Sequence, residues 1–148
     1  MSYEKKLSAA AILGGVIVLA VAANTAVAMV AGRFGAESTF APLTLPVYGA
    51  FTVVGVVVGW WGWRFVEGRS ARPRATLTAL VPVVTVLSLV PDLLLLALRF
   101  VPGTNTAGAV ALMGMHVVVA VLAVPGYLLT SRLLRENRAV GDYRVEAA

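Results

Sequence analysis

The sequence has no cysteine and only one histidine, His116. Without thiols the chain cannot form disulfides, offer a thiolate nucleophile, or hold zinc or an iron–sulfur cluster through cysteine. A single histidine could ligate a haem on both sides only across a dimer. The sequence therefore predicts no metal and no cofactor.

Charged residues are also scarce, at 13% of the 148 residues, whereas hydrophobic residues make up 59%. These proportions do not fit a soluble domain and indicate that lipid surrounds most of the chain. The net charge is +5, but the basic residues lie in short stretches beside hydrophobic segments. This distribution is typical of contacts with anionic lipid headgroups, and we expect no nucleic-acid partner.

Four hydrophobic stretches are long enough to cross a membrane as helices, which takes about 20 residues. They cover residues 7–31, 45–63, 75–98 and 107–131. Glycine, proline and serine mark the segments between them as loops. The expected fold class is an all-α membrane protein, an antiparallel bundle of four transmembrane helices. It forms one domain over residues 1–135, followed by a polar cytoplasmic tail over residues 136–148.

The beginning of the chain also resembles a secretory signal, because basic residues precede an apolar run and Ala26-Val27-Ala28 resembles a cleavage site. The apolar run continues to Ala31, however, and is longer than such signals usually are. We therefore expect the first helix to be retained.

Lysine and arginine are distributed unequally between the two sides of the predicted bundle. One side carries only Arg33 and Arg99. The other side carries Lys5, Lys6, Arg64, Arg69, Arg72, Arg74, Arg132, Arg135, Arg138 and Arg144. The positive-inside rule places the second side in the cytoplasm, together with both termini of a multi-pass protein of the cell membrane. Three tryptophans at this end, Trp60, Trp61 and Trp63, are interpreted as a belt among lipid headgroups rather than a ligand cage.

Each predicted span contains one polar residue at a similar depth, roughly 10–14 Å from the side opposite the termini at ~1.5 Å per residue. These residues are Asn24, Thr52, Asp92 and His116. Polar side chains in a membrane bundle face its interior, so we expect one layer to hold all of them. Small residues flank them at helical spacing, and we interpret the GxxxG pattern of Gly55 and Gly59 as packing within the bundle rather than dimerisation.

Asp92 is the only acidic residue inside a predicted span. An ionised carboxylate there costs at least ~2.5–3.5 kcal/mol, so it needs a partner, and His116 and Arg99 are the candidates. Pro91 removes a backbone hydrogen bond and predicts a kink beside Asp92. The candidate intramembrane polar site consists of Asn24, Thr52, Ser88, Asp92, Arg99 and His116. It is either a pocket or proton-accepting pair, or a polar cluster that fixes the packing of four similar helices.

Several short motifs resemble an uncharacterised actinobacterial family of small four-helix membrane proteins, known only as a domain of unknown function. They are Met115-His116-Val117-Val118-Val119-Ala120, Val124-Pro125-Gly126, a short basic amino terminus, Asn24, and the Leu-Ser-Leu-x-Pro segment from Leu87 to Pro91. The resemblance covers nearly the whole chain and implies the fold and the membrane location. It also implies that His116 and Pro91 occupy signature positions.

The sequence favours a non-catalytic function, either as an accessory subunit or as a small-ligand-binding bundle. The alternative is a proton-coupled transporter or carrier that uses Asp92 and His116 and acts as an oligomer. An enzyme is not expected, because there is no nucleophile with an oriented base, no pair of carboxylates and no metal-ligand cluster. The expected partners are the lipid bilayer and either another membrane protein or a second copy of the chain.

Overall fold

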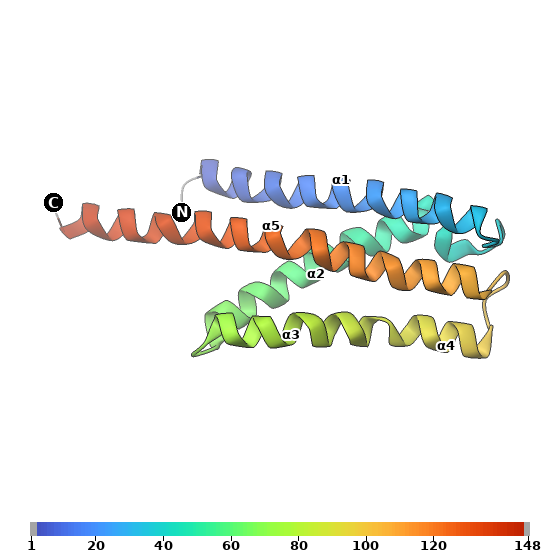
Figure 1. The fold of residues 1–148 in the computed structure, drawn as a ribbon. Coiled ribbons are helices and arrows are strands. Elements are labelled where there is room, and N and C mark those ends of the chain that lie inside the picture. The colour runs from blue at the N-terminus through green and yellow to red at the C-terminus, as the bar shows by residue number, and fades with distance from the viewer. Residues whose placement is uncertain (1–2, 147–148) are drawn as a thin grey trace.

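In the computed structural model, the chain is helical apart from short connections (Figure 1). The structure describes the backbone of residues 3–146 and the side chains of residues 7–135. The helices are α1 (Tyr3–Arg33), the 3-10 helix η1 (Ala41–Leu43), α2 (Leu45–Arg69), α3 (Pro73–Ser88), α4 (Val90–Leu98) and α5 (Thr106–Glu146). Four segments are long and apolar enough to cross a membrane: Leu7–Arg33, Leu45–Arg69, Pro73–Leu98 and Thr106–Arg135. The expected all-α fold with four such helices is confirmed.

The four segments form an antiparallel bundle in which α1 and α5 lie side by side over most of their common length (Figure 1). The helix α2 crosses behind α5 at an angle, and α3 and α4 form the remaining column. The beginning of α1, the end of α5 and the α2–α3 connection lie at one end of the bundle, which we call the proximal end. The connections from α1 to α2 and from α4 to α5 lie at the other, distal end.

The outer surface of the bundle is apolar. Large hydrophobic side chains are widely exposed on every span, for example Val18 at 70%, Phe51 at 73% and Val86 at 63%. The buried apolar cluster is small by comparison and consists of Val56, Trp63, Leu77, Ala123 and Tyr127. A surface this apolar is stable only against hydrocarbon, so the four helices make this a membrane protein.

The third span is broken at Leu89, which separates α3 from α4. Pro91 lies in the first turn of α4, where its missing N–H group is tolerated. Regular bonding resumes when the Leu93 N–H group donates to the Leu89 carbonyl at 3.1 Å. The third span is therefore interrupted beside Asp92, as two separate helices that lie in one column (Figure 1), and a kink there stays a prediction.

Two helices, α2 and α5, end more than five residues beyond their predicted ends. α2 continues to Arg69, so the predicted loop over residues 64–74 shortens to three residues, 70–72. An ion pair of 2.8 Å between Arg64 and Glu67 supports this last turn. α5 continues to Glu146, so the backbone of the predicted tail is helical over residues 136–146, and its cytoplasmic location stays a prediction.

The tryptophan belt is wrong for Trp63. Its side chain is only 7% exposed, and its indole N–H group donates to the Ser131 hydroxyl at 3.1 Å. Trp60 and Trp63 both contact Tyr127, with ring centroids 5.7 and 5.6 Å from the Tyr127 ring. Trp61 alone of the three is largely exposed, at 74%. The angle at which α2 crosses α5 turns one indole into the bundle.

The distal end is held together by Asn105 and Phe40. The Asn105 side chain accepts a bond from the Gly108 N–H group at 2.9 Å, which caps α5, and donates to the Gly35 carbonyl at 2.7 Å. Phe40 is 1% exposed and packs against Gly103 and Gly108. Gly103 has a φ of +78° and leaves no room for a Cβ atom beside the Phe40 backbone. These contacts join the two distal connections.

Candidate polar site in the bundle

The polar residues of α1 and α2 form one hydrogen-bonded cluster. The Asn24 side-chain amide donates to the Thr52 hydroxyl at 3.0 Å, and that hydroxyl donates to the Tyr48 carbonyl at 2.7 Å. The Thr25 hydroxyl donates to the Val21 carbonyl at 2.8 Å, so the Tyr48 hydroxyl, 2.8 Å away, donates to Thr25. Every hydroxyl in this cluster is satisfied, which fixes the register of α1 against α2.

One acceptor of this cluster is left over. Asn24 is 1% exposed, and its Oδ1 atom accepts no hydrogen bond from the described residues. A buried amide oxygen without a donor costs about 1–3 kcal/mol. The Oδ1 atom of Asn24 is therefore a hydrogen-bond acceptor inside the bundle that no described residue uses.

The second half of the site joins α4 to α5. The Asp92 Oδ2 and His116 Nε2 atoms are 3.1 Å apart. This distance is that of an ion pair when the imidazole is protonated, and Oδ2 accepts no aligned hydrogen bond from the described residues. The Asp92 side chain is 8% exposed and the His116 side chain 41% exposed. The carboxylate is thus enclosed, whereas the imidazole reaches the surface of the bundle.

The break at Leu89 determines where this carboxylate lies. Because α4 starts at Val90, Asp92 falls in its first turn. The partial positive charge at the beginning of a helix stabilises a carboxylate there. A continuous third helix would not have offered Asp92 this position.

The two halves of the site lie at a similar depth. Val27 approaches Gly114, and Val16 approaches Gly126, which sets the register of α1 against α5. Asn24, one turn before Val27, therefore lies level with the segment of α5 that follows Gly114 and contains His116. In the described chain no hydrogen bond or ion pair connects the Asn24–Thr52 pair to the Asp92–His116 pair.

Two predicted site residues lie outside these pairs. The Ser88 hydroxyl donates to the Thr85 carbonyl at 2.7 Å, within its own helix. Arg99 is exposed and ends α4 with a φ of 50°, and it forms no ion pair with Asp92. Because the helix stops at Leu98, Arg99 no longer follows the helical face on which Asp92 lies. His116, and not Arg99, is the partner of Asp92.

Sequence reasoning missed a second polar cluster at the proximal end, around Glu67. This carboxylate is 7% exposed and contacts Arg64 at 2.8 Å and Arg135, and it accepts a bond from the Ser131 hydroxyl at 3.1 Å. The available signal was the Arg64-x-x-Glu67 spacing, which favours an ion pair on one helical face. Because residues 64–74 were predicted to form a loop, this spacing was not interpreted as helical.

The chemistry available at the Asp92–His116 pair is proton exchange and hydrogen bonding. No group of three or more histidine, aspartate or glutamate residues that could hold a metal lies within residues 7–135. The pair offers one carboxylate and one imidazole, and both can gain or lose a proton.

Comparison with known proteins identifies a family for this chain. The model of a family of unknown function, DUF6069, matches residues 6–133. No curated protein and no solved structure matches the chain. The resemblance seen in the sequence is confirmed to the extent that a family of unknown function covers nearly the whole bundle.

Proposed function

We propose that this chain, which belongs to the DUF6069 family of unknown function, is a non-catalytic protein of the cell membrane that binds a membrane-spanning helix of a partner protein. The binding face lies around His116, on the side of α5 next to α4. The actinobacterial source implied by the sequence motifs is part of this proposal.

The observation that carries the proposal is the exposure of the His116 side chain, 41%, on the surface of a span that is apolar enough to cross a membrane. At about 1.5 Å per residue, His116 lies roughly 15 Å into the span that begins at Thr106. This is close to the middle of a hydrocarbon layer about 30 Å thick. An imidazole facing lipid there lacks a partner for its second nitrogen, which is costly.

A partner helix removes this cost. Asp92 contacts Nε2 and leaves Nδ1 of His116 without a partner among the described residues. A serine, threonine, asparagine or tyrosine side chain on a neighbouring helix would bond to that nitrogen, as polar residues do between membrane helices. Val117, beside His116, is 46% exposed and adds apolar contact area.

A catalytic function has less support. Asp92 and His116 could transfer a proton, but the site contains no nucleophile that either residue would activate. The acid–base pair therefore supports recognition or proton binding better than turnover.

The unequal distribution of basic residues supports a cytoplasmic position of the proximal end. Because the chain has no cysteine, single substitutions test this directly. We expect a membrane-impermeant thiol reagent to label Ser38→Cys, in the distal connection, on intact cells. We expect it to label Ala71→Cys, in the proximal connection, only after lysis. The reverse labelling pattern would mean that the distal end, and not the proximal end, lies in the cytoplasm.

The partner is tested with a photo-crosslinking residue at position 117, used in the membranes of the organism that encodes the chain. We expect the photo-crosslinking residue at position 117 to form a discrete protein adduct. The adduct should be lost when His116 is also replaced by Phe, because Phe keeps a ring but has no hydrogen-bonding atoms. Val18 is the matched control, because it is 70% exposed on α1 inside the first span.

Each result has a definite meaning. An adduct of twice the mass of the chain identifies a second copy as the partner, and another mass identifies a different protein. Adducts with lipid alone, the same adduct from Val18, or an adduct unaffected by His116→Phe would refute the binding face.

A second candidate function is a proton-coupled carrier acting as an oligomer. The break at Leu89, directly before the Asp92–His116 pair, is the observation that favours it, because broken helices with ionisable groups occur in transporters. Asp92→Asn should abolish proton-driven flux in liposomes while the chain still folds. A proton flux that is unchanged in Asp92→Asn would exclude this candidate.

A further inference from the structure

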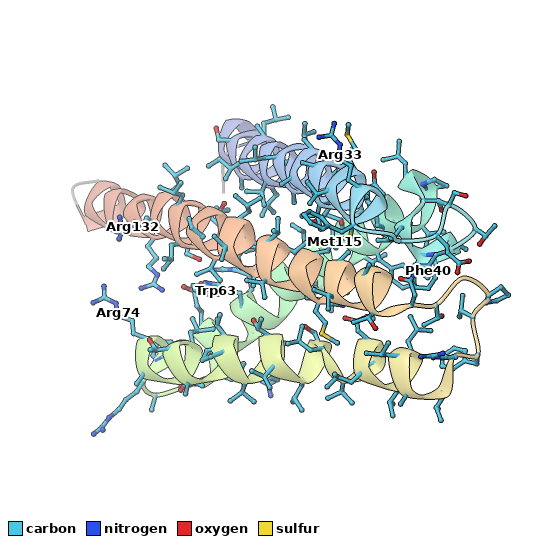
Figure 2. The ribbon with its side chains drawn as sticks, turned by 45° about the vertical axis from the view of Figure 1, so that its right-hand side comes forward. Arg33, Phe40, Trp63, Arg74, Met115 and Arg132 are labelled. Carbon is cyan, nitrogen blue, oxygen red and sulfur yellow. The ribbon has the colours of Figure 1, made fainter. Side chains whose placement is uncertain are left out.

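A groove of about 520 Å³ opens at the proximal end between three helices. Trp63 and Glu67 of α2 contribute to it, and α3 and α5 form its walls. Figure 2 shows Arg74 on α3 and Arg132 on α5 at this end of the molecule, with Trp63 between the two helices. We call this space the proximal groove.

The walls of the proximal groove change from apolar to basic along its length. Towards the middle of the bundle its walls are apolar, with Val81 and Pro82 on α3 and Val124 and Leu128 on α5. Towards the proximal end, the same two walls carry the basic residues Arg74, Arg132 and Arg135. Both walls thus pass from apolar to cationic in the same direction, from membrane interior to membrane surface.

Much of the positive charge in this region is not neutralised within the described chain. Arg135 contacts Glu67, but Arg74 and Arg132 form no ion pair with any described residue. A smaller adjoining cavity of about 350 Å³ shares Arg74 and adds Arg72, which is also unpaired. No side chain caps the beginning of α3, so the partial positive charge of that helix end adds to the same region.

We propose that the proximal groove binds one anionic phospholipid, with its phosphate between Arg74 and Arg132 and an acyl chain along the apolar walls. Charge complementarity selects an anionic headgroup, because unpaired guanidinium groups bind phosphate through charge-assisted hydrogen bonds. The apolar part of the proximal groove favours a lipid over a free phosphate, because a small ion would leave that part of the groove empty. The arginines lie at the ends of the spans, where lipid headgroups are found.

This site differs from the face around His116. It lies at the proximal end of the bundle and uses neither Asp92 nor His116. Lipid binding there is independent of the proposed partner helix, and each proposal can fail without the other.

The test is native mass spectrometry of the full chain in detergent, titrated with phosphatidylglycerol or phosphatidylcholine. We expect selective retention of phosphatidylglycerol. Each arginine should contribute about fivefold, so the double variant Arg74→Gln/Arg132→Gln should weaken this retention about 25-fold. The matched control is Arg33→Gln/Arg99→Gln, which removes two charges at the distal end and should retain the lipid as the wild type does.

A variant that keeps all charges tests the groove itself. Thr78 is exposed and lines the groove, so Thr78→Trp should fill it and prevent retention. Leu80→Trp, on an exposed position of α3 outside the lining, is its control. Because all these positions are exposed, unchanged thermal unfolding should accompany each variant.

Three results would overturn the proposal. Equal retention of both lipids would show no selection of charge, and equal losses in the proximal and distal arginine variants would show only an effect of net charge. Binding of glycerol 3-phosphate as tightly as phosphatidylglycerol, unaffected by Thr78→Trp, would identify a site for a soluble phosphate instead.

Discussion

Replacement of Gly59 by alanine should destabilise the bundle, whereas the same change at Gly55 should not. A Cβ atom at Gly59 would lie 2.6 Å from the Tyr127 hydroxyl oxygen, far inside van der Waals contact. At Gly55 nothing lies within 4 Å of such an atom. The two glycines belong to one GxxxG pattern, yet only one has a packing partner in the bundle.

The cost at Gly59 is large because Tyr127 cannot move aside. Its hydroxyl donates to the Val56 carbonyl at 2.6 Å, and its ring packs against both Trp60 and Trp63. An added methyl in a packed interior costs about 1–3 kcal/mol, and losing the hydrogen bond adds about 1 kcal/mol. We expect Gly59→Ala to lower the free energy of unfolding by about 2–4 kcal/mol.

The assay is reversible unfolding in mixed micelles, followed by circular dichroism, for Gly59→Ala, Gly55→Ala, Tyr127→Phe and the double variant Gly59→Ala/Tyr127→Phe. Without the hydroxyl, the nearest ring atom is 3.4 Å from the new Cβ, an ordinary contact. The double variant should therefore lose about 2–4 kcal/mol less than the two single losses added together, because the clash is relieved and the same hydrogen bond is lost only once. Equal stability of Gly59→Ala and Gly55→Ala would refute the reasoning and reopen dimerisation through this motif.

Two further predictions concern the ends of the bundle. Asn105→Ala should lower the free energy of unfolding by about 1–2 kcal/mol, because it removes the cap of α5 and the bond to the Gly35 carbonyl, and faster hydrogen exchange at the distal end would show it. Unchanged exchange there would contradict this role. Arg135→Gln should destabilise by up to about 1 kcal/mol through the loss of its pair with Glu67, whereas Arg132→Gln should leave the unfolding midpoint unchanged, because Arg132 forms no ion pair with the side chains of residues 7–135.

The candidate site was partly predictable because depth along a helix can be counted from the sequence. Asn24 and Thr52 were expected in one layer and form a hydrogen bond, and Asp92 was expected to need a partner and contacts His116. Counting residues gives no rotation about the helix axis, however. It therefore gave no sign that the layer consists of two pairs, or that Arg99 turns away from Asp92 after the helix ends.

The proximal cluster could not be predicted for a related reason. The arginines were visible as topology signals, but the partner of Glu67 on α5 depends on the register between α2 and α5, which brings Glu67 to Arg135 and Trp63 to Ser131. Nor does the sequence show why Gly126 follows Pro125, whereas in the structure a Cβ atom there would lie 2.5 Å from Val16.

The sequence by itself determined the helical class, the number of spans, the helix interruption beside Pro91 and the exclusion of thiol chemistry. Each depends on local composition: the length of an apolar run, the missing N–H group of proline, the absence of a residue type. The tertiary structure decided which side chains meet, which glycine is packed, which tryptophan is enclosed and where the proximal groove opens. These depend on how each helix is rotated and crossed against its neighbours, which the packing of distant residues fixes.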